Sequence, residues 1–350
     1  MLKLHTNNLY GTIPSSIGQL LALTVFYLDS NSLSSSIPAE LGQLSNLVKV
    51  FLYHNQLSGS LSEALFDNLI QLTSLLLFEN KLTSTIPSSI TKVTKLKVFH
   101  INENKISGPI ASTWESLSGK LQVFSAKDNL LTGSIPPEIG SLTKLQKLDL
   151  GQNNLNSQLP VGISKLTKLV DLNLANNNFN GTIPAEFSRL TRLTSLHVKY
   201  NGLTGTIPPE LCECVLLQEL DLQDNFLTGT IPSELGALSD LLELDVVNNT
   251  LTGSIPREIS LMTKLTMLSM GFNRLNSSLP SEISNCGDLI QLKISGNFQM
   301  GGTIPDEYGM LSNLRTLLLF DGGFTGTIPR SFGNLSNLDM LLLYSNSLRG

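Results

Sequence analysis

Few residues in this chain of 350 could perform chemistry, and the cysteines are the first to consider. Cys212 and Cys214 form a C-x-C pair, and Cys286 follows much later in the chain. A zinc or redox site would need such thiols close to further ligands in space. Cys214 and Cys286 instead stand where related segments of this sequence carry Leu, so we expect both to be small hydrophobic core residues. No metal and no cofactor is predicted.

The histidines and the acidic residues offer no catalytic set either. The four histidines are scattered through the chain, and no Ser-His-Asp arrangement or phosphate-binding loop is visible. Asp221 and Asp245 are a candidate acid–base pair, since both sit in a Leu-Asp context one repeat apart. That context recurs along the chain and is typical of surface positions. We therefore predict that this chain is not an enzyme.

Composition excludes further classes of function. Charged residues make up only 15% and the net charge is −5 with no basic block, which argues against nucleic acid or an anionic membrane surface as partner. No apolar run has the length of a membrane span. Three cysteines cannot form a disulfide scaffold, and 41% hydrophobic residues are too many for a disordered chain.

A repeat of 24 residues supplies the elements that must position these side chains. One copy reads Leu-x-x-Leu-x-Leu-x-x-Asn-x-Leu over residues 145–155, and the step becomes 25 residues at three places. Gly322 replaces the Asn in a single copy. The Asn positions are Asn7, Asn31, Asn55, Asn80, Asn104, Asn129, Asn153, Asn177, Asn201, Asn225, Asn249, Asn273, Asn297 and Asn346.

Each part of the repeat has a mechanical interpretation. The Leu-x-Leu alternation predicts a short strand with inward leucines, and such strands must stack into one parallel sheet to bury that face. The Asn amide can satisfy backbone groups of the following bend. In Leu203-Thr-Gly-Thr-Ile-Pro208, Gly permits a special backbone conformation and Pro begins a short helical turn. No 3.6-residue period is sustained, which favours 3-10 or irregular turns.

This frame resembles the plant-type leucine-rich repeat over essentially the whole chain. The resemblance implies an α/β leucine-rich-repeat solenoid, a right-handed curved superhelix of about 14–15 rungs with a concave parallel β-sheet, short 3-10 or irregular convex segments and often a second sheet. The frame is similar to that of ectodomains of receptor-like kinases and receptor-like proteins and to that of polygalacturonase-inhibitor proteins. Residues 1–350 are predicted to form a single solenoid domain.

Some positions depart from the repeat. Ser62 and Ala111 replace Pro, and Gly322 lacks the amide; we interpret these as drift in a long array that makes the rungs bulge. The chain begins within a strand pattern at Leu2 and stops within a repeat at Gly350, with no signal peptide visible. We expect a fragment without terminal caps.

Residues between the inward leucines are the candidate binding residues of the concave face. Early rungs carry outward aromatic and apolar residues, middle rungs are polar and mostly acidic, and late rungs are apolar again with Leu318, Phe320, Leu342 and Tyr344. The alternative for the apolar zones is burial under a cap or in self-association. The candidates are Tyr27, Phe51, Tyr53, Leu76, Phe78, His100, Asp149, Asp171, His197, Lys199, Tyr200, Asp221 and Asp245.

Two further sets of candidates lie outside this face. A row of cations before each rung's first Leu is a candidate polyanion edge or a plain solvated edge: Lys95, Lys120, Lys144, Lys168 and Arg192. Sequons that permit N-glycosylation begin at Asn180, Asn248, Asn276 and Asn334.

The leading hypothesis is a ligand-recognition region of a cell-surface receptor-like protein. It would bind a protein or peptide through the concave sheet, and the resemblance implies an extracellular location and a co-receptor as further partner. One alternative is a secreted inhibitor or a protein that binds cell-wall polysaccharide or an enzyme. Another is an intracellular leucine-rich-repeat scaffold.

Overall fold

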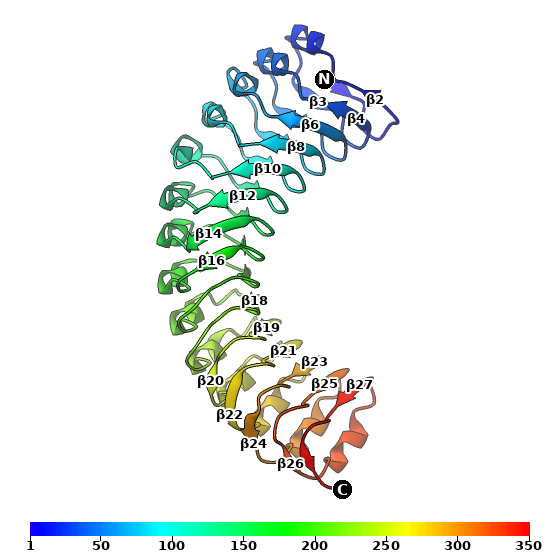
Figure 1. Ribbon diagram of the computed structural model, residues 1–350, viewed down its shortest axis with the longest axis vertical. Coiled ribbons are helices and arrows are strands. Elements are labelled where there is room, and N and C mark those ends of the chain that lie inside the picture. Colours follow the sequence, from blue (N-terminus) through cyan, green and yellow to red (C-terminus); the bar gives the residue numbers. More distant parts are fainter. The chain divides into compact units, whose positions relative to one another are not determined.

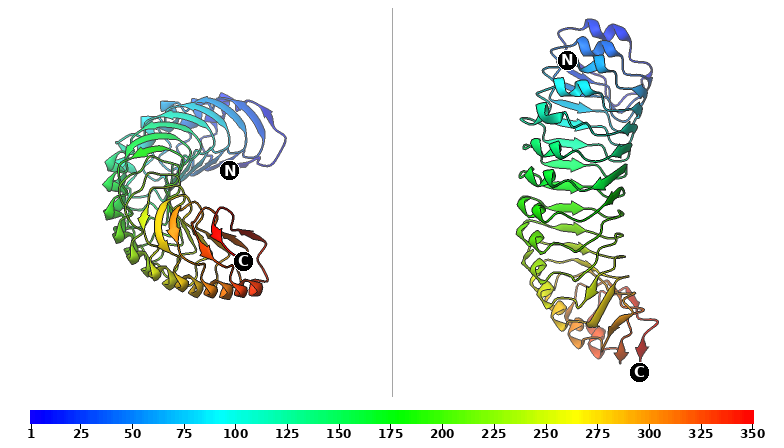
Figure 2. Two further views of the ribbon diagram at one scale, coloured as in Figure 1. Left: turned by 60° about the horizontal axis from the view of Figure 1, so that its bottom comes forward. Right: turned by 60° about the vertical axis from the view of Figure 1, so that its left-hand side comes forward.

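The computed structural model describes residues 1–350, whose contacts divide the chain into two compact units. Unit 1 spans Met1–Asn178 and unit 2 spans Phe179–Gly350. Each unit is a solenoid of stacked parallel strands joined by short 3-10 turns (Figure 1), as the repeat predicts. Figure 2 shows the 3-10 turns along the outer edge of the coil in each unit and the strands of the main sheet along its inner edge.

The main sheet of unit 1 contains one short parallel strand from each rung. Neighbouring strands pair in register, so that Phe124 is level with Phe99 on one side and Leu148 on the other. Its strands are β1 (Leu2–Lys3), β3 (Val25–Tyr27), β5 (Lys49–Phe51), β7 (Ser74–Leu76), β9 (Val98–His100), β11 (Val123–Ser125), β13 (Lys147–Asp149) and β15 (Asp171–Asn173).

The main sheet of unit 2 repeats this arrangement. Leu220 pairs with Leu196 and Leu244, and the outward residues are aligned in the same way. Its strands are β17 (Ser195–His197), β18 (Glu219–Asp221), β19 (Glu243–Asp245), β21 (Met267–Ser269), β23 (Gln291–Lys293), β25 (Thr316–Leu318) and β27 (Met340–Leu342).

A second set of parallel strands follows the Asn of most rungs, as the resemblance implies. In unit 1 they are β2 (Tyr10–Gly11), β4 (Ser32–Ser35), β6 (Gln56–Ser60), β8 (Lys81–Ser84), β10 (Lys105–Gly108), β12 (Leu130–Gly133) and β14 (Asn154–Gln158). β16 (Asn178–Asn180) lies at the boundary of the units in the sequence. In unit 2 they are β20 (Thr252–Gly253), β22 (Arg274–Ser278), β24 (Gln299–Gly301), β26 (Thr325–Gly326) and β28 (Ser347–Leu348).

The convex segments are 3-10 turns, which confirms the prediction from the missing 3.6-residue period. Most begin after a proline that occupies the N-cap with extended ψ, such as Pro208 at φ −65° and ψ 125°; the proline precedes the first turn rather than lying inside it. The turns are η1 (Ser15–Gln19), η2 (Ala39–Gln43), η3 (Glu63–Phe66), η4 (Ser88–Lys92), η5 (Trp114–Leu117), η6 (Pro137–Ser141), η7 (Val161–Lys165), η8 (Ala185–Arg189), η9 (Pro209–Glu213), η10 (Ser233–Ala237), η11 (Arg257–Leu261), η12 (Ser281–Asn285), η13 (Asp306–Met310) and η14 (Arg330–Asn334).

The core of each unit consists of the inward leucines and their substitutes. Leu148 in unit 1 is fully buried and Leu220 in unit 2 is 1% exposed. Cys214 and Cys286 are fully buried as well, which confirms that they replace Leu in the core. Burial raises the pKa of each of these two thiols to about 11, so neither is a reactive thiolate near neutral pH.

The repeated Asn connects each rung to the one before it, as predicted from its amide. Asn153 donates from Nδ2 to the carbonyls of Leu150 and Gly151 in its own rung and to that of Ala126 in the preceding rung. Its Oδ1 accepts the backbone N–H of Leu131 at 2.9 Å. One buried side chain therefore satisfies backbone groups that water cannot reach.

Gly322 shows why one rung lacks this amide. A Cβ at Gly322 would lie 2.1 Å from a ring carbon of Phe324, so the phenyl ring fills the space that an Asn side chain would need. Asn346 in the next rung makes the ordinary bond from its Oδ1 to the Phe324 N–H and also accepts the N–H of Gly322. Ser62 is another departure from the repeat, and it caps η3 by accepting the N–H of Ala64.

Candidate ligand-binding surface

The inner face is the side of each main sheet that points away from the leucine core. In unit 1, strand register aligns Tyr27, Phe51, Leu76 and His100 in one row across β3, β5, β7 and β9. The rings of Tyr27 and Phe51 stack with centroids 4.2 Å apart and planes 4° from parallel. All four side chains are partly exposed, as predicted for outward residues.

A second row follows two residues later in each of these rungs. Tyr53 and Phe78 stack with centroids 4.4 Å apart, and Phe51 and Tyr53 link the two rows at 6.3 Å. Because stacked faces shield each other, the ring edges are what this surface offers to a ligand. We call the four residues Tyr27, Phe51, Tyr53 and Phe78 the aromatic ladder.

A buried carboxylate lies beside the aromatic ladder, and the sequence analysis did not single it out. Asp29 is only 5% exposed. Burial raises the pKa of Tyr53 most and the nearby Asp29 carboxylate raises it further, so the phenol stays protonated beside that carboxylate. Asp29 lies two residues after Tyr27, so its outward register could have indicated it.

Histidines border the aromatic ladder. His100 lies 6.2 Å from the Phe78 ring, and its Nε2 is buried without a hydrogen-bond partner. Burial lowers the pKa of His100, and the positive charge of Lys147 lowers it further, so the ring is neutral near pH 7. His54 pairs with Glu79 at the end of the neighbouring strands.

The last rungs of unit 1 change from aromatic to charged. Lys147 binds Asp171 at 2.5 Å. Asp149, a candidate binding residue, is only 8% exposed, so its carboxylate offers little surface to a ligand. Burial raises its pKa even though Lys147 acts in the opposite direction. Short strand spacing lets neighbouring side chains cover it.

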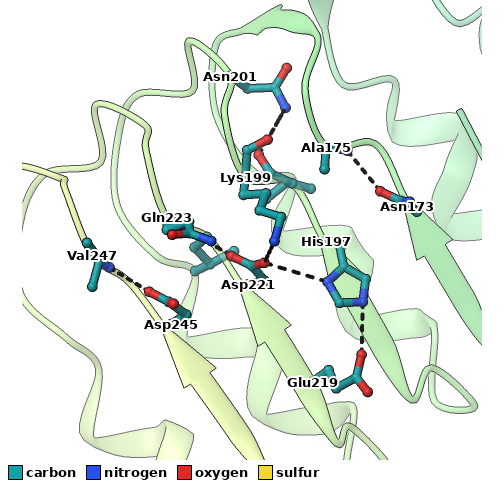
Figure 3. A network of polar contacts seen from close by, with 12 residues as sticks. Asn173, Ala175, His197, Lys199, Asn201, Glu219, Asp221, Gln223, Asp245 and Val247 are labelled. Carbon is teal, nitrogen blue, oxygen red and sulfur yellow. Dashed lines mark hydrogen bonds and ion pairs between the residues drawn. The ribbon is translucent and has the colours of Figure 1, made fainter. Parts of the chain in front are cut away.

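In unit 2 the predicted polar residues form a connected network, which Figure 3 shows around Asp221. Asp221 receives Lys199 at 2.7 Å and faces His197 Nδ1 at 3.8 Å, and the other ring nitrogen of His197 contacts Glu219 at 3.0 Å. Burial alone would raise the pKa of Asp221, but the hydrogen bonds from His197 and Lys199 outweigh it and lower the pKa.

Asp245 is the next carboxylate in the same row, and its environment differs. It accepts the backbone N–H of Val247 at 3.0 Å (Figure 3). None of the ion pairs of the structure includes it. Burial raises the pKa of Asp245 to about 6, and the nearby negative charge of Asp221 adds to the shift. Tyr200 is separate from these rows: it is 48% exposed, has φ 52° and lies after the strand.

The candidate polyanion edge is exposed in unit 1. Lys120 and Lys144 are exposed without an ion pair, whereas Lys95 donates to Gln71 at 2.5 Å and Lys168 is partly buried. In unit 2, Arg192 is exposed. The sequon residues Asn180, Asn248, Asn276 and Asn334 are all exposed, although Asn248 donates to Asp224.

Other kinds of site find little support in the geometry. No three His, Cys, Asp or Glu side chains are arranged to hold a metal ion. Cys212, Cys214 and Cys286 are free thiols. No helix of the structure combines the length and the hydropathy needed to cross a membrane.

Comparison with known proteins identifies the repeat of this chain. The Leucine rich repeat family matches residues 143–203, 215–275 and 22–44. The LRR protein LIC12759 of Leptospira interrogans is 31% identical over 99% of this chain and 84% of its own, with a TM-score of 0.79. This chain belongs to the leucine-rich repeat family. No curated protein matches its sequence.

Plant receptor ectodomains are also similar to this leucine-rich repeat chain. The ectodomain of the Arabidopsis receptor kinase HAESA, solved with the peptide hormone IDA and the co-receptor SERK1, is 32% identical with a TM-score of 0.94. That of GASSHO1/SCHENGEN3 from Arabidopsis thaliana, solved with CASPARIAN STRIP INTEGRITY FACTOR 2, is 34% identical with a TM-score of 0.85. The chain is covered to 100% and 99% but spans only 58% and 44% of those proteins. The fold is a scaffold for binding.

Proposed function

We propose that this chain is the ligand-recognition region of a cell-surface receptor-like protein and binds a peptide or protein ligand through its inner face. The observation that carries the proposal is the aromatic ladder, because contiguous, partly exposed aromatic side chains on a rigid sheet are typical of binding sites. The sheet holds these rings in place before binding, which lowers the entropy lost on association.

The similarity to HAESA supports the kind of ligand. HAESA was solved with a peptide hormone and a co-receptor. By this likeness, our proposal includes an extracellular location, a peptide ligand and a co-receptor as second partner. A role as non-enzymatic binding protein is part of the same proposal.

A double variant tests the proposal. Peptides selected from a displayed random library on the intact chain serve as the probe, and Phe51→Ser with Tyr53→Ser should weaken their binding about tenfold or more. Tyr10→Ser is the matched control, because Tyr10 is 86% exposed on β2, away from the inner face. Unchanged binding in the double variant, with the circular dichroism spectrum preserved, would contradict the proposal.

A second candidate rests on the exposed edge of unit 1. Lys120 and Lys144 stand one rung apart on this edge without carboxylate partners, so they could hold an acidic polysaccharide through additive contacts. Lys120→Gln with Lys144→Gln should abolish retention on immobilised oligogalacturonate. If the variant is still retained, these two lysines do not bind the polysaccharide, and the edge is a solvated surface.

A further inference from the structure

Asp245 forms no ion pair of its own, although the charges of Lys293 and Lys199 act on it from a distance. Asp221, one strand away, has Lys199 at 2.7 Å, whereas the only contact of Asp245 is the Val247 N–H. A half-buried carboxylate with an unpaired oxygen favours a cationic or strongly donating group from outside.

Beyond Asp245 the residues Ser269, Gly271 and Ser295 are short, whereas Met267, Gln291 and Lys293 on the same rungs are long. Ser269 is directly beside Asp245 in register, followed by Lys293 on β23. Gly271 and Ser295 continue the row that begins at Val247, and a Cβ at Gly271 would lie 2.9 Å from the Ser295 carbonyl oxygen. The close approach that Gly271 permits is that of the neighbouring rung's own backbone.

Ser269 supplies an independent sign of a missing partner. The residue is 1% exposed, and its hydroxyl has no hydrogen-bond partner in the structure. A buried hydroxyl left unpaired costs about 1–3 kcal/mol. Because the chain's own atoms cover this hydroxyl, a ligand group can pair with it only after the neighbouring side chains move aside.

Aromatic rings border the other side of this short-chain stretch. Phe272 and Phe320 meet edge to face at 6.1 Å, and Phe320 stacks on Tyr344 at 4.6 Å. Phe272 is 50% and Tyr344 is 55% exposed. An apolar or aromatic ligand side chain would cover part of this exposed area.

We propose that the inner face of unit 2 from β19 to β27 binds an extended peptide segment that places one basic side chain against Asp245 and one aromatic or aliphatic side chain against Phe272, Phe320 and Tyr344. The Asp245 and Phe320 rungs are three strand spacings apart, roughly 14 Å, which an extended chain spans with about four residues. The two side chains are thus separated by about four positions in the ligand.

Lys293 limits the ligand further. It lies two strands from Asp245 in the same row, and no carboxylate pairs with it. A second basic side chain at this point would meet like charge, whereas a neutral or acidic residue would not. The segment therefore carries a single basic residue rather than a basic run.

The inference rests on the proposed peptide-binding function and narrows its ligand. Two synthetic probes with the required separation, Ac-Arg-Gly-Ser-Gly-Trp-amide and its reversed sequence, are titrated against the whole chain with 5-fluorotryptophan as the fluorine NMR label. At least one of them should bind. The versions with Gln for Arg, and the version with Arg and Trp adjacent, should bind about tenfold more weakly.

Matched variants locate the site. Asp245→Asn removes the charge without changing size, and Ser269→Leu fills the short-chain stretch with a residue that the same row carries at Leu318. Each variant should bind the Arg probe about tenfold more weakly than the unchanged chain does. Asp306→Asn and Ser233→Leu are the controls, because these exposed residues lie on the convex turns η13 and η10 and not on the inner face, and they should have no effect.

The outcomes separate this inference from the general function. If library-selected peptides bind and depend on the aromatic ladder, while the Arg probes bind equally well with Gln or to Asp245→Asn, the inference is overturned and the proposed function stands. If no selected peptide binds and the Arg probes bind with the predicted dependence, the inference stands and the role of the aromatic ladder fails. Loss of the Arg preference in the folded Ser269→Leu variant would support the inference independently of charge.

Discussion

Unit 1 and unit 2 share one frame of inward leucines and bridging asparagines, while the residues between the leucines differ. In unit 1, Tyr27 on β3 stacks on Phe51 on β5, and Tyr53 and Phe78, which follow β5 and β7, stack in the same way. On the rungs of β17 and β18 in unit 2 they are charged groups that pair across strands, whereas Asp245 on β19 forms no ion pair. The same spacing of neighbouring strands thus supports an apolar surface in one unit and an ionic network in the other, because outward positions carry no core packing.

The core should respond equally in both units. Leu148→Ala in unit 1 and Leu220→Ala in unit 2 are each expected to lower the free energy of unfolding by about 2–5 kcal/mol, because each leaves a cavity among buried leucines. Chemical denaturation followed by circular dichroism measures this change. A loss below about half a kilocalorie in either unit would show that its leucine is not a core residue.

The asparagine bridge should separate the ordinary rungs from the exceptional one. Asn153→Ala is expected to cost about 1–3 kcal/mol, because several buried backbone groups lose their partner. Gly322→Asn restores the frame residue but should also destabilise, since Phe324 occupies the space of its side chain. Stabilisation by Gly322→Asn would mean that the ring is free to move away.

The two carboxylates of unit 2 should respond to pH with opposite sign. Asp245 has a pKa of about 6 in the folded chain, above its ordinary value, so its ionisation removes stability as the pH rises from about 4 to about 6. Asp245→Asn should therefore stabilise by on the order of 1 kcal/mol at about pH 7, after allowance for solvent screening, and have little effect at about pH 4.

Asp221 provides the contrast to Asp245. Its pKa is lowered, so its stabilising contribution is present above the ordinary pKa and is lost as the pH falls through the folded value. Asp221→Asn should destabilise at about pH 7, because Lys199 loses its charged partner. Thermal melts of both variants across this pH range would reveal the opposite signs, and equal signs would contradict the assigned networks.

The aromatic ladder should matter least for stability. Removing one stacked ring, as in Phe51→Ser, is expected to cost no more than about 1.5 kcal/mol beyond the small loss of buried area, because these rings are partly exposed. A cost as large as that of Leu148→Ala would place Phe51 in the core. The ladder would then be structural rather than a binding surface.

Most of the fold was predictable, because a solenoid repeats one local pattern. Leu positions, the Asn bridge and the 3-10 turns each depend on residues within a rung and its neighbour. The turn glycines fit as well: Gly229 has φ +76° and a Cβ there would lie 2.8 Å from the Thr206 methyl group. The position of the turn prolines was less well predicted, since Pro208 is the N-cap.

For the candidate site, the sequence predicted only the direction in which each side chain points. Period-two alternation indicates which residues point to the inner face, and Tyr27 and Asp149 both do so. The alternation does not say how far neighbouring side chains cover an outward residue, and Asp149 and Ser269 are buried although both point outward. It also left Asp29 unrecognised beneath the aromatic ladder.

The sequence by itself determined the frame: the leucine period, the asparagine bridges and the row of residues that points to the inner face. Only the tertiary structure decided which of those residues have partners. Asp221 and Asp245 both end a Glu-Leu-Asp segment, yet one carboxylate is held by Lys199 and the other is not. The reason is physical, because a pKa depends on charges and burial contributed by neighbouring strands, 24 residues away in the chain.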